Sequence, residues 1–219
     1  MTTLSHSYSA IKLYENCPLR YYRQRVLKDI VDEGGEASRY GERIHAMLEA
    51  RLKGEDLPQE VERYEPLCRS VEHLGRRGEV YIEKELVLNK NLTPTGWWSE
   101  DAWLRSKLDV LVVSGQDAVV MDWKTGKRRP DMFQMHLFAA QVFKHFPDVN
   151  HIKTSLVWLK DLSMDTEQHV RSDSAVIWGE VMSRIQRIEA SLEHDTWPAK
   201  PSGLCRYCPA RHNCDFANV

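Results

Sequence analysis

Four cysteines divided between the two ends of the chain constrain its fold more than any other sequence feature. Cys17 lies near the start, and Cys205, Cys208 and Cys214 lie close together at the end. Two thiolates separated by two residues fit either a zinc ion or an iron–sulfur cluster. A single metal site with all four ligands would therefore join the two ends of the chain. His212 can replace one thiolate if the metal is zinc.

The other sequence features favour a reducing compartment. Cys68 lies in a charge-rich helical stretch without a metal-binding neighbour, and we interpret it as a small core residue. Five unevenly spaced cysteines are unlike the disulfide framework of a small secreted protein. Residues 1–7 contain no apolar segment typical of a signal peptide. We therefore expect a cytoplasmic protein of a prokaryote or of a phage-infected host cell.

The length of the chain predicts a single domain, because 219 residues can bury a substantial core. Within it we expect a helical segment at residues 1–75, a sheet core at residues 76–170, and a helix with the cysteine tail at residues 171–219. No run of about 18 apolar residues occurs, so we expect no membrane partner. With 32 acidic and 30 basic residues, net charge does not identify a partner.

Hydrophobic periodicity predicts alternating helical and extended segments. The expected helices are 7–28 with a break at Pro18, 37–53, 59–75, 131–146 and 174–192. The expected strands are 80–88, 102–113, 118–123 and 152–159.

Two neighbouring strands predict a metal site. Residues 114–117 are polar and contain glycine, which favours a hairpin loop with Val113 facing Ala118. Counting back along the antiparallel pair places Asp109 opposite Asp122. Facing carboxylates repel each other, so we expect a cation between them, and Mg²⁺ or Mn²⁺ prefers such oxygen ligands.

Lys124 reinforces this hypothesis, because residues two apart in a strand project from the same face. It follows Asp122 by two positions and should therefore lie beside the expected cation.

Short motifs occur in a fixed order along nearly the whole chain. They are Tyr14 to Tyr22 around Cys17, Gly41 to His45, Lys107 to Asp109, Val120 to Gly126, Gln134 to Phe138, and the three terminal cysteines. In this ordered set the sequence resembles the PD-(D/E)XK nucleases of the RecB type. Within them it is similar to the iron–sulfur branch that includes the CRISPR-adaptation and AddB-like nucleases.

The resemblance implies a fold and a cofactor. The fold would be α/β (α+β), with a restriction-endonuclease-like core in which helices flank a mixed central sheet. A helical lobe would be held by a 4Fe-4S cluster bound to Cys17, Cys205, Cys208 and Cys214, with structural zinc as the alternative.

The resemblance also implies roles for the strand residues. His45, Asp109 and Asp122 would bind one or two divalent cations, with the backbone carbonyl of Trp123 as a further ligand. Lys124 would stand over the attacking water.

Two positions on the predicted helix 131–146 belong to the same resemblance. Gln134 matches a glutamine that orients the lysine or the DNA backbone in such nucleases. Phe138 occupies a position that is often tyrosine, so a hydroxyl contact to the substrate is absent there.

The implied function is a metal-dependent deoxyribonuclease, most simply an exonuclease acting on DNA ends or single strands. Its setting would be repair, recombination, CRISPR adaptation or phage DNA processing. The alternatives are a non-catalytic DNA-binding or assembly module that keeps the fold, and a non-specific endonuclease.

Two further groups are candidates for contact with DNA. Lys127, Arg128 and Arg129 directly follow the catalytic strand, which favours contact with phosphates. The tryptophans can stack on unpaired bases or pack within the core; these are Trp97, Trp98 and Trp103.

Overall fold

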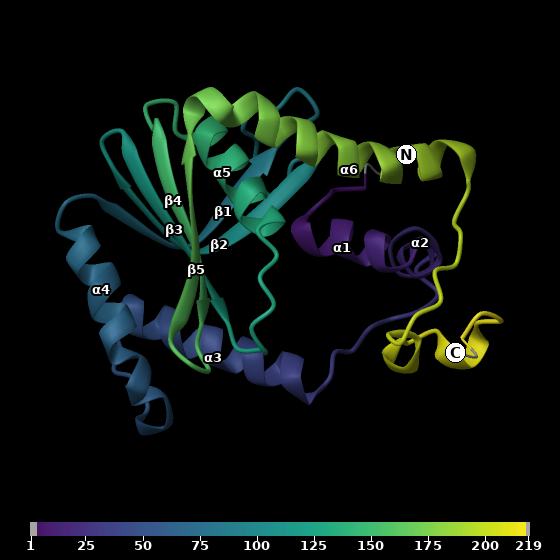
Figure 1. Ribbon diagram of the computed structural model, residues 1–219, viewed down its shortest axis with the longest axis horizontal. Coiled ribbons are helices and arrows are strands. Elements are labelled where there is room, and N and C mark those ends of the chain that lie inside the picture. The colour runs from purple at the N-terminus through teal and green to yellow at the C-terminus, as the bar shows by residue number, and fades with distance from the viewer. Residues whose placement is uncertain (1–3, 218–219) are drawn as a thin grey trace. The chain divides into compact units, whose positions relative to one another are not determined.

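The computed structural model, which describes residues 4–217, contains a five-stranded mixed sheet in the order β1-β2-β3-β4-β5 (Figure 1). The strands are β1 Glu79–Leu88, β2 Leu104–Ser114, β3 Asp117–Lys124, β4 His151–Trp158 and β5 Ser163–Val170. β3 and β4 pair in parallel, and the other neighbouring strands pair antiparallel. Parallel neighbours need a long crossover, which α5 (Phe133–His145) supplies.

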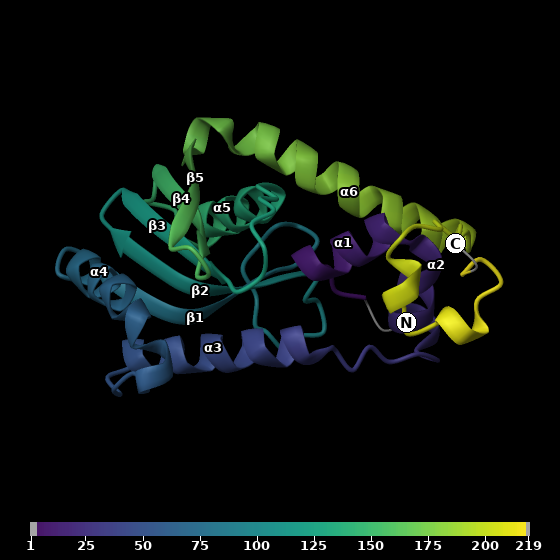
Figure 2. The same ribbon diagram turned by 60° about the horizontal axis from the view of Figure 1, so that its bottom comes forward.

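Helices cover both faces of this sheet and bury an apolar core on each. α5 packs on one face, in a cluster that includes Val120 and Phe138. α3 and α4 lie on the opposite face, where Ile44 and Val112 belong to a second cluster (Figure 2). α3 is Glu36–Leu52 and α4 is Glu65–Gly75. The expected mixed α/β architecture, with helices flanking a central sheet, is confirmed.

The chain divides into two compact units. Unit 1 consists of Met1–Glu33 and Gly179–Val219, and unit 2 consists of Gly34–Trp178. The helices of unit 1 are α1 Tyr8–Asn16, α2 Pro18–Tyr21, the π-helix η1 Tyr22–Leu27, and the portion of α6 (Ser174–His194) beyond Trp178. Unit 1 therefore combines the two ends of the chain, and unit 2 contains the whole sheet.

Direct contacts hold the two chain ends together within unit 1. The Tyr14 hydroxyl donates to the Arg187 carbonyl oxygen at 2.9 Å. Glu15 accepts from Arg184 at 2.7 Å, and its backbone carbonyl accepts from Lys200 at 2.7 Å. These contacts join α1 to α6 and to the segment after it.

Most of the expected elements are present. A helix boundary falls at Cys17, directly before Pro18, as expected. The stretch expected to be one helix from residue 59 is a 3₁₀-helix, η2 (Gln59–Tyr64), followed by α4. The strand β5 was not predicted. Cys68 is fully buried, and burial raises the pKa of its thiol to about 11, which confirms a core position.

No helix among the described residues is long and apolar enough to cross a membrane.

Candidate active site

The ladder between β2 and β3 ends where the acidic residues begin. The pairing Val113 with Ala118 is as predicted, and the last pair is Val110 with Met121. Asp109 does not continue this ladder to face Asp122, as the sequence led us to expect. Instead its Oδ2 accepts a hydrogen bond from the Trp123 backbone N–H at 2.7 Å. The carboxylate thus replaces a strand partner, and β2 separates from β3 here.

A change of phase in β2 explains the difference. Leu108 and Leu111 belong to the same core cluster although they are three residues apart, whereas alternation would place residues two apart on one face. β1 changes phase as well, because Tyr81 and Leu86 both pack against that cluster. Between them, Glu83 has a left-handed φ of 54°, which is uncommon for any residue other than glycine. Both strands are therefore distorted at the same level of the sheet.

Asp122 is held by two polar side chains. Its Oδ1 accepts from Gln134 Nε2 at 2.8 Å, and its Oδ2 lies 2.6 Å from Lys124 Nζ. Asp122 is 4% exposed, and burial raises the pKa of its carboxyl to about 6. Lys124 opposes this shift and the charge of Asp109 reinforces it. The prediction that Lys124 shares a face with Asp122 is confirmed.

His45 reaches this group from α3. Its Nδ1 lies 3.2 Å from Asp109 Oδ1. Burial alone would lower the pKa of His45, but the hydrogen bond and charge of Asp109, the charge of Asp122, and the Trp123 backbone together raise it. α3 approaches β3 closely at Gly41, because a Cβ there would lie 3.0 Å from Thr125 Oγ1. A glycine one turn before His45 therefore permits this packing.

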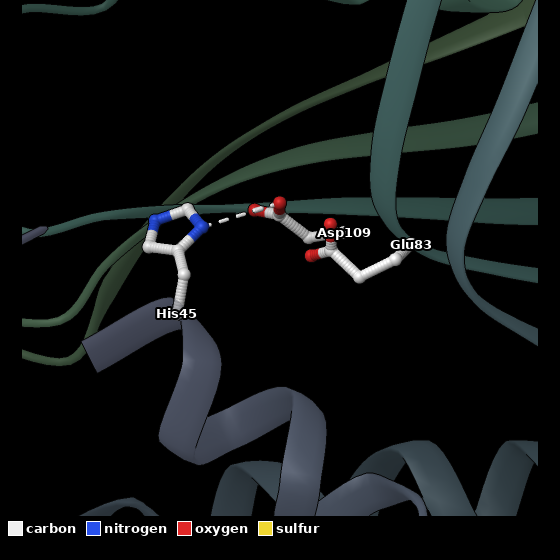
Figure 3. Close-up of side chains that lie close together, drawn as sticks. All are labelled: His45, Glu83 and Asp109. Carbon is white, nitrogen blue, oxygen red and sulfur yellow. Dashed lines mark hydrogen bonds and ion pairs between the residues drawn. The ribbon is translucent and has the colours of Figure 1, made fainter. Parts of the chain in front are cut away.

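Glu83 is a candidate metal ligand that the sequence did not predict. Among residues 4–217, His45, Glu83 and Asp109 form the single group of three potential ligands whose ligand atoms all lie within 4.8 Å of one another. Figure 3 shows the three side chains pointing toward one another from α3 and two neighbouring strands. Lys107 Nζ lies 2.5 Å from Glu83 Oε2, so a cation already occupies one side of this carboxylate.

The donor set suits a hard divalent cation. Carboxylate oxygens are the preferred ligands of Mg²⁺ and Mn²⁺, and imidazole is a common ligand of transition metals. Buried carboxylates repel one another unless a cation compensates their charge, and the raised pKa of Asp122 reflects that cost. Asp122 Oδ2 is buried and has no hydrogen bond of good geometry, although Lys124 lies close to it. These residues therefore fit a divalent metal ion.

The family follows from this site and from a match over most of the chain. A family model described as the PD-(D/E)XK nuclease superfamily matches residues 5–215. The chain belongs to this superfamily. No curated protein matches the chain.

Two solved structures share the fold of this nuclease. The crystal structure of SSO0001 is 13% identical with a TM-score of 0.55, and the match covers 99% of this chain and 88% of that one. A putative exonuclease from Eubacterium rectale is 12% identical with a TM-score of 0.59, and the match covers 96% of this chain and 88% of that one. At such low identity these likenesses show the fold alone.

Two residues of α5 that the sequence singled out, Gln134 and Phe138, lie in different surroundings. Gln134 contacts Asp122, as described above. Phe138 is 3% exposed and belongs to the core cluster beneath α5. Its ring therefore packs within unit 2, away from any position where it would contact solvent.

The four cysteines implied as cluster ligands all lie in unit 1 and line one pocket. Cys17, Cys205, Cys208 and Cys214 share it with basic side chains that include Arg23. The cysteines are half-buried and form no disulfides, and Cys205 Sγ accepts a hydrogen bond from the Ser202 backbone N–H at 3.3 Å. No three of these sulfur atoms lie within 4.8 Å of one another.

The residues expected to contact DNA differ in their availability. Trp103 is 2% exposed and belongs to the core, whereas Trp98 is 87% exposed. Arg128 is paired with Asp165 on β5, at 3.0 Å between Nε and Oδ2. Lys127 and Arg129, on either side of it, are exposed.

Proposed function

We propose that this protein is a divalent-metal-dependent deoxyribonuclease that hydrolyses phosphodiester bonds. The observation that carries the proposal is the grouping of Asp109, Asp122 and Lys124 where the β2–β3 ladder ends, with His45 beside Asp109. A superfamily of nucleases is the expected context for two acids followed by a lysine.

In this proposal the metal ligands are His45, Asp109, Asp122 and the Trp123 carbonyl oxygen. Glu83 joins them, because its carboxylate lies with His45 and Asp109 in one group of potential ligand atoms. A bound Mg²⁺ or Mn²⁺ would polarise a phosphoryl oxygen and lower the pKa of a bound water.

Lys124 and Gln134 have roles of their own in the proposed reaction. Lys124 Nζ, which pairs with Asp122, can orient the attacking water and neutralise charge that develops on the phosphate. Gln134 donates to the other oxygen of Asp122 and so fixes the orientation of that carboxylate. Both groups therefore act around one buried acid.

We propose that the substrate is a DNA end or a single strand, cleaved exonucleolytically in the cytoplasm during repair, recombination, CRISPR adaptation or phage DNA processing. The order of the motifs supports the RecB type within the superfamily. Trp98, with 87% of its surface exposed, can stack on an unpaired base.

We also propose that the pocket lined by the four cysteines binds a 4Fe-4S cluster. The support for this proposal is that all four cysteines, from both ends of the chain, line the same pocket. Structural zinc is the alternative, because thiolates bind either metal. Arg211 lies in the pocket wall, where its charge would offset that of a thiolate-bound cluster.

A time course with end-labelled single- and double-stranded DNA tests the proposed activity. Wild type and Asp122→Ala are compared in Mg²⁺, Mn²⁺ or EDTA, with Lys124→Ala as a second variant. Metal-dependent loss of label by wild type alone supports the nuclease and reports its polarity. Discrete cuts in circular DNA would instead indicate an endonuclease. DNA binding without cleavage by any of the three proteins would indicate a non-catalytic module.

A further inference from the structure

A cavity of about 450 Å³ lies in unit 2 next to the end of the catalytic strand. Its size is in the range of pockets that hold small ligands. The residues that line it come from α3, η2, and the segments after β3 and β4: Tyr40, Arg63, Tyr64, Thr125, Leu159 and Lys160.

Backbone contacts connect this cavity to the proposed active site. Thr125 directly follows Lys124, and the Leu159 backbone N–H donates to the Lys124 carbonyl oxygen at 2.9 Å. Gly41, which follows the lining residue Tyr40 in α3, allows this helix to approach Thr125 closely. A ligand in the cavity would therefore lie within one residue of the lysine that acts on the phosphate.

Two cations of the cavity have no acidic partner. Arg63 donates to the Tyr64 hydroxyl at 2.5 Å, with its Cζ 4.7 Å from that ring's centroid, so an aromatic side chain orients it. Lys160 is exposed. Within residues 4–217, neither Arg63 nor Lys160 forms an ion pair with a carboxylate. Both charges are thus available to an anionic ligand.

The third feature is an exposed aromatic ring. Tyr40 is 43% exposed and lines the cavity together with Arg63 and Lys160. An aromatic face beside unpaired cations is the combination that binds a base and its phosphate in single-stranded nucleic acid.

A larger cavity of unit 2 has the opposite character. Its volume is about 610 Å³, and the acids in its wall, Glu55, Asp56, Glu62 and Glu65, outnumber its two arginines. Such a wall repels a phosphate backbone. The cavity lined by Arg63 and Lys160, here called the basic cavity, is therefore the one suited to DNA.

We propose that the basic cavity binds the nucleotide adjacent to the cleaved phosphodiester, with its base stacked on Tyr40 and its phosphate held by Lys160 and Arg63. This assignment rests on the proposed nuclease function. It adds a specific subsite to that function, since stacking on Tyr40 needs an unpaired base at this position.

Short single-stranded oligonucleotides with one abasic residue, moved along the strand, test the subsite. In wild type, the abasic residue is expected to raise KM roughly tenfold at one position, which is the effect of losing one base–aromatic stack. Tyr40→Ala should raise KM by a similar factor with every intact oligonucleotide and leave kcat within about twofold. In that variant the abasic residue should have no further effect at the sensitive position.

Matched variants separate stacking from general damage. Tyr40→Phe keeps the ring and should retain the wild-type KM within about twofold. Lys160→Gln should raise KM for the oligonucleotide and weaken the dependence of KM on salt concentration. Lys153→Gln removes one charge from β4 as a matched control and should change neither quantity. If Tyr40→Ala is unfolded at the assay temperature, two other measurements test the subsite. These are the abasic series with wild type and the KM of Lys160→Gln.

The outcomes that overturn the subsite are distinct from those that overturn the function. Cleavage by Tyr40→Ala with the wild-type KM, or an abasic effect that persists undiminished in that variant, rejects the subsite and leaves the nuclease intact. Absence of metal-dependent cleavage by wild type rejects both.

Discussion

Asp122 is the residue at which function and stability oppose each other most directly. Its carboxyl is buried close to a second carboxylate, and its pKa is raised from the ordinary value of 3.8 to about 6. The proton-linked stability that this acid contributes is present below pH 3.8 and is lost as pH rises through about 6. At neutral pH without metal, the folded protein therefore carries an unfavourable buried charge.

Asp122→Asn should reveal this cost. Because asparagine is a neutral group of the same shape, the variant in EDTA should melt a few degrees above wild type at pH 8, with a smaller difference at pH 5. Its cleavage rate in Mg²⁺ should fall at least about 100-fold, because the proposed metal loses a ligand. Thermal melts at both pH values and single-turnover cleavage measure the two effects. A variant that melts below wild type at pH 8 would contradict this account.

Glu83 shows what alternation in a strand cannot predict. A strict period of two assigns each residue to a face, but β1 and β2 both change phase at the level of Glu83 and Asp109. The predicted register of β2 with β3 is nevertheless confirmed from Val113 and Ala118 to Val110 and Met121, because it depends on the hairpin and not on β1. Gly115 and Gln116 alone form the turn, and pairing continues through Ser114 with Asp117, so the predicted register is retained.

Glu83→Gln should weaken binding of the divalent metal. The change removes a charge from the group of potential ligands around His45 and Asp109, and we expect Mn²⁺ affinity to fall at least about tenfold. Titration calorimetry with Mn²⁺ measures this directly. Glu85→Gln is the matched control, since Glu85 lies two residues further along β1 and is exposed. If Glu83→Gln and Glu85→Gln bind Mn²⁺ with equal affinity, Glu83 is not a ligand of the proposed metal.

At the scale of elements, the segment between β3 and α5 is tied to the edge strand β5. Arg128 donates to both oxygens of Asp165, at 3.0 and 2.5 Å, and Trp158 Nε1 donates to Asp165 Oδ2 at 2.7 Å. Arg128 holds the pKa of the Asp165 carboxyl below its usual range. Because Arg128 is exposed to solvent, the pair adds little to stability, and its main effect is on the position of the loop.

Arg128→Ala should weaken DNA binding several-fold and leave the melting temperature nearly unchanged, because Lys127 and Arg129, the proposed phosphate contacts, lose a fixed position. Asp165→Asn distinguishes the mechanism. If Arg128 acts by fixing the loop, the Asp165 variant should weaken DNA binding similarly. If Arg128 contacts phosphate itself, removing its acidic partner should strengthen binding. Fluorescence anisotropy with labelled DNA in Ca²⁺ measures both variants.

The elements also show why the sheet was only partly predicted. The buried strands β3 and β4 have apolar sequences and were found with nearly correct ends. β5 is an edge strand in which exposed and half-buried residues alternate, and Ser163–Val170 is mostly polar. Its pairing with β4 supplies the order that its sequence lacks. Tertiary pairing of this kind cannot be read from local periodicity.

At the scale of the whole molecule, the proposed chemistry and the cysteines occupy different units. His45, Asp109, Asp122 and Lys124 belong to unit 2, and the four cysteines belong to unit 1. Unit 1 also has direct contacts between the chain ends, such as those of Tyr14 and Glu15 with α6. The ends of the chain are therefore joined by side chains as well as by the proposed cluster.

Cys208→Ala tests the division of roles between the units. Loss of one ligand should abolish the brown chromophore of a 4Fe-4S cluster and lower the melting temperature by about 10 °C. The reason is that the variant loses a cross-link between distant chain segments. By analogy with a disulfide that closes a loop of roughly 190 residues, such a cross-link stabilises the folded state by at most about 5 kcal/mol. Partial proteolysis should then cleave unit 1 first, because the sheet core of unit 2 contains no cluster ligand. Cys68→Ala is the control that removes a buried cysteine without changing the chromophore. A Cys208→Ala protein that stays brown and melts like wild type would show that these cysteines bind no cluster.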